Sequence, residues 1–315
     1  MRIVVTGAGG FIGHHLVNYL KNKGHYVRVV DIKYPKWEMS RADEFLLTDL
    51  RYPAFHVFDN IDQVYHLAAD MGGIGYIENY KAQIVFNNTM INMLTLKACQ
   101  EKGVKRFLFT SSACVYPGYL QNKGHSDLEE NDAYPADSED GYGWEKLMME
   151  RACRHFREDY LLDTRIARFH NIFGPMGEYE GGREKSPAAL CRKVALSDGK
   201  IEIWGDGTQE RSYCYIDDCV EALYRLMESD YCDPINIGTD RKVTINELAD
   251  IIIKISGKKI TKEYDLTKPQ GVKARNAVIR RANFILKWNP QVSLEEGLEK
   301  TYRWIEKQSS SANPR

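Results

Sequence analysis

The stretch RIVVTGAGGFIG, residues 2–13, decides the fold of this chain. Its first five residues predict a β-strand, and glycines follow at positions 7, 10 and 13. Glycine there allows a tight turn, a close approach of backbone to a pyrophosphate, and close packing of the next helix on the sheet. Because a helix from Phe11 to Lys23 should follow, a dinucleotide site is favoured over a merely structural turn. The expected cofactor contacts are Gly7, Gly10, Phe11, Ile12 and Gly13.

Short β-branched runs alternate with amphipathic segments through the first half of the chain. The runs YVRVVD (26–31), QVYHLAA (63–69) and RFLFTSS (106–112) are strand-like, and 82–101 has helical periodicity. This βαβ rhythm predicts an α/β fold with a Rossmann-like, doubly wound parallel sheet. Ligands of such a sheet bind at the carboxyl ends of its strands.

The rhythm loosens after the strand-like TRIARF, where glycine and proline become frequent. We expect a dinucleotide-binding domain over 1–170, with returning segments from the later chain, and a smaller C-terminal α/β substrate domain over 171–307. The tail 308–315 is expected to be disordered. Further helices are expected over 142–160, 187–197, 216–229, 244–256 and 294–307.

The composition excludes several classes of protein. Lys and Arg total 43 against 44 Asp and Glu, which provides no field for nucleic acid or an anionic membrane. No apolar run approaches the roughly 20 residues that span a bilayer, and the N-terminus lacks a signal-peptide pattern, so a cytoplasmic protein is expected. The seven cysteines include no CxxC pair, which indicates mostly buried free thiols and no metal site.

Two aspartates are candidates for the adenosine end of the cofactor. Asp31 ends the second predicted strand, where a carboxylate can accept hydrogen bonds from both ribose hydroxyls and would repel a 2′-phosphate. This favours NAD, although nearby Lys33 keeps NADP open, and the alternative for Asp31 is a turn or cap residue. Asp49, in TDLR, is a candidate second contact or an ordinary loop aspartate.

A second group of residues indicates redox chemistry on a hydroxyl. Ser112 ends a predicted strand, and Tyr142 and Lys146 follow on a predicted helix. Their four-residue spacing puts the phenol and the ammonium on one helical face, where the ammonium is expected to lower the pKa of the phenol. Such a phenol is a competent general base or acid during hydride transfer. YxxxK alone is common by chance, but its place after the glycine-rich turn favours the catalytic interpretation.

The motifs TGAGGFIG, HLAA, SSACVYP, YGWEK and RFHNIFGP resemble extended short-chain dehydrogenases that act on nucleotide sugars, an NAD-dependent epimerase/dehydratase family. The segments LAADMGGIGYI (67–77), GGREKSPAALCRK (181–193), WGDGTQERSY (204–213) and GVKARN (271–276) are similar more specifically to the GDP-mannose 3,5-epimerases. The resemblance covers nearly the whole chain. One departure is Lys273-Ala274-Arg275, where Arg-Gly-Arg is usual.

This resemblance implies a role for each matching residue. Ser112, Tyr142 and Lys146 would serve the redox step, and Cys114 and Lys185 would serve as base and acid for epimerisation. The implied cofactor contacts include Leu67, Ala68 and Ala69, together with Tyr142 and Lys146. The implied sugar-nucleotide contacts are Gly72, Ser112, Cys114, Asn171, Glu184, Lys185, Lys193, Gln209, Arg211 and Arg275.

The resemblance further implies conversion of GDP-D-mannose to GDP-L-galactose and GDP-L-gulose. Oxidation at C4 makes the protons at C3 and C5 acidic, inversion needs two proton carriers on opposite faces, and bound NAD is regenerated. It also implies a homodimer formed through the helices over 82–101 and 142–160, although the same chain could equally cover their apolar faces.

Several alternatives stay open from the residues themselves. Cys114 is also consistent with a small buried hydrophobe and Lys185 with a solvated charge, whereas His170 is expected to be a hydrogen-bonded structural residue. Another nucleotide-sugar 4-epimerase or 4,6-dehydratase would use Tyr142 and Lys146 without needing Cys114 and Lys185. A non-catalytic NAD-sensing protein on the same fold is the alternative from a different class.

Overall fold

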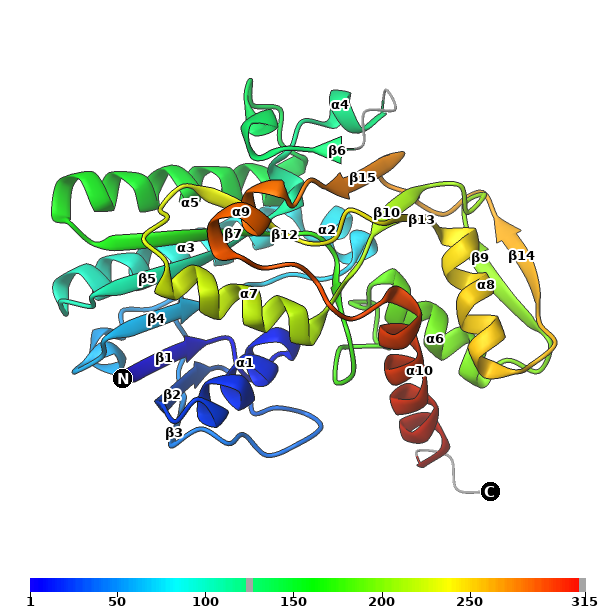
Figure 1. Ribbon diagram of the computed structural model, residues 1–315, viewed down its shortest axis with the longest axis horizontal. Coiled ribbons are helices and arrows are strands. Elements are labelled where there is room, and N and C mark those ends of the chain that lie inside the picture. The colour runs from blue at the N-terminus through cyan, green and yellow to red at the C-terminus, as the bar shows by residue number, and fades with distance from the viewer. Residues whose placement is uncertain (123–126, 312–315) are drawn as a thin grey trace.

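The computed structural model describes residues 1–122 and 127–311, and its centre is a parallel sheet (Figure 1). Seven strands of the described chain form this sheet in the order β12-β7-β5-β4-β1-β2-β3, and every neighbouring pair is parallel. The strands are β1 (Arg2–Thr6), β2 (Tyr26–Asp31), β3 (Glu44–Leu47), β4 (Gln63–His66), β5 (Arg106–Ser112), β7 (Asp163–Phe169) and β12 (Pro234–Ile237).

Both faces of the sheet are buried, which explains the nearly continuous apolar runs in its strands. Ile3 and Val5 of β1 belong to a core shared with helices α1 (Phe11–Asn22) and α7 (Ile216–Glu228). Val4 points the other way, into a core shared with α3 (Lys81–Glu101) and α5 (Asp140–Tyr160). Figure 1 shows α3 and α5 on one side of the sheet and α1 and α7 on the other. The predicted Rossmann-like, doubly wound fold is confirmed.

The strand order reverses beside β1, whose neighbours are β2 on one side and β4 on the other. Ligands of doubly wound sheets bind at such a switch point, outside the carboxyl ends of the strands. The loops that follow β1 and β4 therefore meet at the expected cofactor position.

The later part of the chain contributes smaller sheets beyond this edge. A four-stranded sheet has the order β13-β10-β15-β6, and two-stranded sheets pair β11 with β8 and β14 with β9. These strands are β6 (Asp127–Leu128), β8 (Ile172–Phe173), β9 (Lys200–Trp204), β10 (Glu210–Ser212), β11 (Cys214–Tyr215), β13 (Lys242–Thr244), β14 (Thr261–Asp265) and β15 (Ala274–Ala277). The remaining helices are α2 (Ile74–Asn79), α4 (Gly118–Asn122), α6 (Ser186–Leu196), α8 (Ile245–Ser256), α9 (Arg280–Leu286), α10 (Leu294–Ser311), and the short 3-10 turns η1 (Phe55–Phe58), η2 (Ala113–Val115) and η3 (Glu130–Ala133).

The predicted helices agree with the observed ones within a few residues, except at the C-terminus. The tail from residue 308 was expected to be disordered, but α10 continues to Ser311. Continuing a helix adds one hydrogen bond for each residue that becomes ordered, and Ser310 also donates to the carbonyl oxygen of Glu306 at 2.9 Å. Residues 312–315 of the expected tail lie outside the described residues. In the described part of the chain, every helix is too short or too polar to cross a bilayer.

Candidate active site

The glycine-rich turn joins β1 to α1, and the close approach of backbone atoms explains the glycines at positions 7 and 13. Gly7 has a positive φ of 73°, and a Cβ there would lie 2.6 Å from the backbone nitrogen of Ala68. A Cβ at Gly13 would lie 2.7 Å from the carbonyl oxygen of Gly7. Among the described residues, a Cβ at Gly10 would meet only that same oxygen, at 3.2 Å. The turn is therefore packed on its inner side and open at Gly10.

The start of α1 is suited to an anion. Among the described residues, no side chain caps this end of the helix at Gly10, and its first turn carries no acidic residue. The backbone N–H groups of the first turn, which include those of Phe11 and Ile12, have no partner within an α-helix and carry the positive end of its dipole. These features fit the pyrophosphate of a dinucleotide.

Asp31 lies at the end of β2, beside this turn. Its carboxylate accepts hydrogen bonds from the backbone nitrogens of Gly9 at 2.8 Å and Lys33 at 3.1 Å. Burial raises the pKa of Asp31, which a ribose hydroxyl donor would offset. The ammonium of Lys33 lies 3.7 Å from Glu178, which supplies a partner other than a 2′-phosphate. Both observations fit NAD.

Asp49 has a strong partner of its own. Its two carboxylate oxygens accept from the guanidinium of Arg51 at 2.6 to 3.0 Å, which lowers the pKa of Asp49. Its role as an adenine-side contact stays a prediction.

The loop after β4 is held against the turn by a buried chain of hydrogen-bonded polar groups, which was not predicted from the sequence. The backbone nitrogens of Leu67 and Ala68 donate to Thr6 Oγ1, both at 3.2 Å, immediately before Ala69. Thr6 Oγ1 lies 2.8 Å from His66 Nδ1, and His66 Nε2 lies 2.8 Å from Asn92 Oδ1. Burial lowers the pKa of His66 to about 3, so this imidazole is neutral and orders the loop through hydrogen bonds.

Ser112, Tyr142 and Lys146 come together at the carboxyl end of β5. A hydrogen bond from Ser112 acts to lower the pKa of Tyr142, and Ser112 Oγ also accepts from the backbone nitrogen of Cys114 at 3.2 Å. One helical turn later, Lys146 Nζ lies 5.7 Å from the centroid of the Tyr142 ring and donates to the carbonyl oxygen of Thr110 at 3.1 Å. The phenol and the ammonium therefore share one face of α5.

The expected lowering of the Tyr142 pKa is wrong for the protein as described. Burial is the largest effect on this phenol and raises its pKa, and the neighbouring Cys114 and Glu145 raise it further. Burial also lowers the pKa of Lys146, which weakens the ammonium as a source of positive charge. Tyr142 is consequently held in its protonated form.

Cys114 and Lys185 approach this group from different halves of the chain. Cys114 lies in η2 after β5, and Lys185 is the N-cap residue of α6. Burial raises the pKa of Cys114 and lowers that of Lys185, and the charge of a Cys114 thiolate would act in the opposite direction on Lys185, raising its pKa. Both shifts favour the uncharged forms, a thiol and an amine, and a thiol and an amine are groups that can take up or deliver a proton.

The thiol is also fixed sterically. A Cβ at Gly143 would lie 2.2 Å from the carbonyl oxygen of Cys114, which in turn accepts from the backbone nitrogen of Glu139 at 2.9 Å. The glycine in YGWEK is therefore required for the thiol-bearing turn to pack on α5.

Two of the expected sugar-nucleotide contacts lie on adjacent strands. Arg211 of β10 is in register with Arg275 of β15. Arg275 donates to Gln121 Oε1 at 2.6 Å and to the carboxylate of Glu139, both partners that the sequence did not indicate. Burial and the charge of Arg275 lower the pKa of Arg211 to about 10. Among the residues that the structure describes, only Arg275 of these two neighbouring arginines is paired with a carboxylate, and two such guanidiniums form a suitable site for a diphosphate.

Gly72, Asn171 and Glu184, three further expected contacts, are each constrained locally. A Cβ at Gly72 would lie 2.8 Å from Cβ of Tyr76, so only glycine fits. Asn171 has a positive φ of 43° and donates to the carbonyl oxygen of Ser212 at 3.0 Å. The Glu184 carboxylate accepts from the backbone nitrogen of Gly182 at 2.7 Å. These contacts shape the backbone and make no direct link between the three residues.

Lys193 and Gln209 form a separate group at strand β9. Lys193 Nζ donates to the carbonyl oxygen of Glu202 at 2.8 Å and lies 5.8 Å from the ring centroid of Trp204. Gln209 Nε2 donates to the carbonyl oxygen of Trp204 at 3.4 Å. Within the described residues, the buried Oε1 of Gln209 has no partner, which leaves it available to a ligand. Trp204 is a member of this group that sequence reasoning did not single out as a contact.

The remaining polar candidates are structural. His170 is fully buried, with Nε2 3.0 Å from Asn236 Oδ1, and burial lowers its pKa to about 3. The prediction of a hydrogen-bonded structural histidine is confirmed. All seven cysteines are free, and five of them are buried.

The dinucleotide turn and the group of Ser112, Tyr142 and Lys146 are typical of an NAD-dependent enzyme, and similarity to known proteins identifies its family. The family model described as "NAD dependent epimerase/dehydratase family" matches residues 3–238. The chain therefore belongs to this family, which confirms the class predicted from the motifs and NAD as its cofactor.

Several individual members of the family are similar to this chain. The chain is 45% identical over 314 residues to GDP-mannose 3,5-epimerase 1 of Oryza sativa subsp. indica, and the alignment covers 98% of this chain and 82% of that protein. Its structure is similar to UDP-glucose 4-epimerase of Thermotoga maritima with UDP-glucose, with a TM-score of 0.90, 28% identity, and coverage of 98% and 100%. It is also similar to UDP-glucuronic acid 4-epimerase of Bacillus cereus, solved in complex with UDP-glucuronic acid and NAD. The TM-score is 0.85 and the identity 30%, and the alignment covers 98% of this chain and 100% of that one.

Proposed function

We propose that the chain is a GDP-mannose 3,5-epimerase, which converts GDP-D-mannose to GDP-L-galactose and GDP-L-gulose. The observation that carries this proposal is the position of Cys114, which contacts Ser112 and packs on the helix of Tyr142 and Lys146, within electrostatic reach of Lys185. A 4-epimerase or a 4,6-dehydratase uses the second group but has no need for the first. The 45% identity to the rice enzyme supports the same assignment.

The first step is oxidation at C4 of the hexose. Bound NAD, held by the glycine-rich turn and Asp31, would supply a reversible hydride acceptor for C4 and a positive charge that favours ionisation of a nearby phenol. Tyr142 accepts the proton of the C4 hydroxyl, and Ser112 holds the phenol through its hydrogen bond. Lys146 is anchored on Thr110 and contributes its charge from the same face of α5.

The second step is proton exchange on carbon. The C4 ketone acidifies the hydrogens at C3 and C5, so Cys114 can take a proton from one face and Lys185 can deliver one to the other. The original proton leaves with the thiol, and the new C–H bond forms with inversion. Cys114 then releases its proton to solvent and Lys185 takes one up from solvent. Tyr142 finally returns its proton to the C4 oxygen, so that every group regains its starting protonation state.

The remaining contacts are assigned by chemistry. Arg211 and Arg275 would hold the diphosphate, with Gly72, Asn171 and Glu184 shaping the backbone around the sugar. Lys193, Gln209 and Trp204 would hold the nucleoside, because an aromatic face with amide and ammonium groups suits a purine base. Residues 1–170 with β12 and α7 would form the cofactor domain and the rest of 171–307 the substrate domain.

The chain should also form a homodimer in the cytoplasm. Helices α3 and α5 pack together and leave Phe86 64%, Trp144 49% and Met148 46% exposed. Exposed aromatic and sulfur side chains on neighbouring helices are typical of a subunit interface. Seven free cysteines are consistent with a reducing compartment.

The proposal is tested by incubating the holoenzyme in heavy water with a panel of nucleotide hexoses and recording mass and NMR spectra. We expect deuterium at C5 and C3 of GDP-mannose, with both epimers formed. Inversion at C4 without deuterium would indicate a 4-epimerase, and loss of water would indicate a dehydratase. Bound NAD without turnover of any sugar would favour the NAD-sensing alternative.

A further inference from the structure

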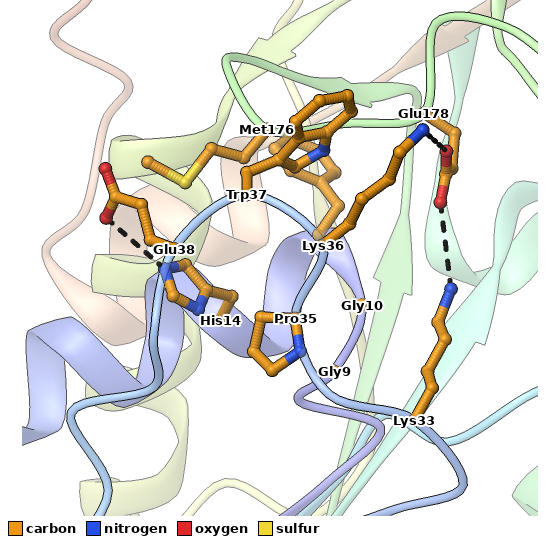
Figure 2. Close-up of a pocket in the computed structure, with 11 residues that line it drawn as sticks. Gly9, Gly10, His14, Lys33, Pro35, Lys36, Trp37, Glu38, Met176 and Glu178 are labelled. Carbon is orange, nitrogen blue, oxygen red and sulfur yellow. Dashed lines mark ion pairs between the residues drawn. The ribbon is translucent and has the colours of Figure 1, made fainter.

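A segment between β2 and β3 crosses the glycine-rich turn. We call residues 33–38 the strap. The carbonyl oxygen of Lys33 lies 2.1 Å from the position that a Cβ of Gly9 would take, so the strap and the turn are in direct contact. A cavity of about 70 Å³ is lined by Gly9, Gly10 and Phe11 of the turn and by Lys33 and residues 35–38 of the strap. Figure 2 shows Gly9 and Gly10 beside these strap residues. The strap therefore covers the turn that receives the pyrophosphate.

Charged side chains join the strap to a loop from the other half of the chain. We call residues 176–180 the opposing loop, two of whose residues, Met176 and Glu178, line the same cavity. Lys36 Nζ lies 3.2 Å from Glu180 Oε1 and 3.9 Å from Glu178 Oε2, and Lys33 Nζ lies 3.7 Å from Glu178 Oε1. In Figure 2 the two ammoniums lie on either side of Glu178. Two positive charges thus meet two negative charges across the junction.

Aromatic rings strengthen the same junction. The ring of Trp37 in the strap stacks on Tyr179 in the opposing loop, with centroids 5.5 Å apart and an interplanar angle of 22°. Trp304 of α10 lies edge-on to both, with centroids 5.0 Å from Trp37 and 5.7 Å from Tyr179. Such aromatic pairs add to the stabilisation from buried area. Three segments distant in sequence are therefore fastened together beside the cofactor turn.

The other end of the strap is attached to α1. Glu38 Oε2 lies 3.7 Å from His14 Nε2, on the helix whose N-terminus faces the expected pyrophosphate. The strap is consequently held at both sides of the cavity, by the opposing loop and by α1.

We propose that the strap and the opposing loop form a clasp that retains NAD between turnovers. The dinucleotide can leave the turn only when Trp37 separates from Tyr179 and Trp304, so these contacts set the rate of its dissociation. Retention suits a reaction that takes a hydride and returns it to the same carbon, because a cofactor lost in between would leave the sugar oxidised. The inference rests on NAD as the cofactor and not on which sugar nucleotide is the substrate.

The test measures NAD dissociation in the absence of any sugar. The purified holoenzyme is loaded with NADH, an excess of NAD is added, and the decay of bound-NADH fluorescence gives the dissociation rate. We expect Trp37→Ala to accelerate dissociation at least tenfold and Trp37→Phe to do so less, because phenylalanine retains part of the stack. Tyr34→Ala is the matched control, since Tyr34 lies in the same strap but is 61% exposed and contacts Phe45 instead. This control should stay within twofold of the wild-type rate.

The charged contacts provide an independent test. Lys36→Glu should accelerate dissociation several-fold, and the double change of Lys36→Glu with Glu180→Lys should restore at least half of the lost retention. Lys36→Gln and Glu180→Gln replace Trp37→Ala if that variant does not fold, and each should accelerate dissociation about threefold. Unchanged dissociation in these variants, with a lower melting temperature of the NAD-free protein, would overturn the proposal and make the cluster only a structural staple. Because no sugar is present, the result is independent of whether GDP-mannose is the substrate.

Discussion

The Nη1 of Arg275 lies 3.6 Å from the Sγ of Cys114, and the same guanidinium pairs with Glu139. The arginine lowers the pKa of Cys114, whereas burial and the Glu139 carboxylate raise it, and the net effect is a raised value. Glu139 therefore acts on the proposed base through charge, although it lies outside every motif that identified the site.

Replacing Glu139 with Gln should make Cys114 more reactive. The change removes a negative charge that disfavours the thiolate, so the pKa of Cys114 falls and more thiolate is present at neutral pH. We expect alkylation of Cys114 by iodoacetamide at pH 7.5 to accelerate about three- to tenfold, measured by mass spectrometry of the peptide. In the wild-type protein the rate should still rise above pH 8.5, the ordinary thiol value. Cys232 is the internal control, and an unchanged or slower reaction at Cys114 would contradict the electrostatic account.

Tyr142→Phe should abolish the redox step and leave the cofactor in place. The phenol moves the C4 hydroxyl proton, whereas the turn at Gly7, Gly10 and Gly13 holds the pyrophosphate. We expect turnover to fall by about 10²- to 10⁴-fold, the usual contribution of a general acid-base group. The NAD content of the purified variant, measured after denaturation, should match that of the wild type. Near wild-type turnover would show that Tyr142 is not the redox group.

Asp31→Asn should weaken NAD binding and slightly stabilise the NAD-free protein. Burial raises the folded-state pKa of Asp31 above its unfolded value, so ionisation costs stability as the pH rises from the unfolded to the folded pKa, and the full cost remains at higher pH. Removing that charge should raise the melting temperature at pH 7 by about 1 to 2 °C. Loss of a charged acceptor for the ribose hydroxyls should weaken NAD about 10- to 100-fold.

Asp49→Asn is the contrasting variant. Arg51 lowers the pKa of Asp49, so its ionised form stabilises the fold above the unfolded pKa, and its removal should lower the melting temperature. Equal NAD affinity for Asp31→Asn and the wild type would leave Asp31 as a turn residue only.

Trp144→Glu should dissociate the proposed dimer. Trp144 is 49% exposed on α5, beside α3, and a carboxylate there would be desolvated in an interface. Sedimentation should show a monomer for the variant and a dimer for the wild type at micromolar concentration. A monomeric wild-type protein would contradict the proposed dimer. Arg154→Glu, which changes an exposed ion pair on the same helix, is the control and should remain a dimer.

The sequence predicts features that depend on short spacings. Gly7 to Gly13 specify the turn because its geometry excludes larger residues, and the four-residue step from Tyr142 to Lys146 specifies a shared helical face. The sheet and most helix boundaries could also be predicted, because the periodicity of apolar residues is likewise a short-range feature of the sequence. The end of α10 was not predicted correctly. Its last residues are serines, which are poor helix formers and become helical only when the preceding helix continues through them.

Features that depend on long-range packing could not be predicted. Glu139 and Arg275 are 136 residues apart, and Trp37 meets Tyr179 and Trp304 only because the two halves of the chain close on each other. The predicted direction of the shift in the Tyr142 pKa was also wrong. The four-residue spacing shows that an ammonium is near, but it does not show the burial of the phenol, which has the larger effect on its pKa.

Deuterium exchange by two variants tests the central claim most directly. Cys114→Ala and Lys185→Ala remove one proton carrier each but leave Ser112, Tyr142 and Lys146 in place. Both variants, given GDP-mannose in heavy water, should form some 4-keto sugar with transient NADH yet incorporate less than about 1% of the wild-type deuterium at C3 and C5. Cys114→Ser should recover little, because an alcohol is far less acidic than a thiol. Deuterium incorporation by both variants at ordinary rates would contradict the account, leaving Cys114 as a packing residue and Lys185 as a solvated charge.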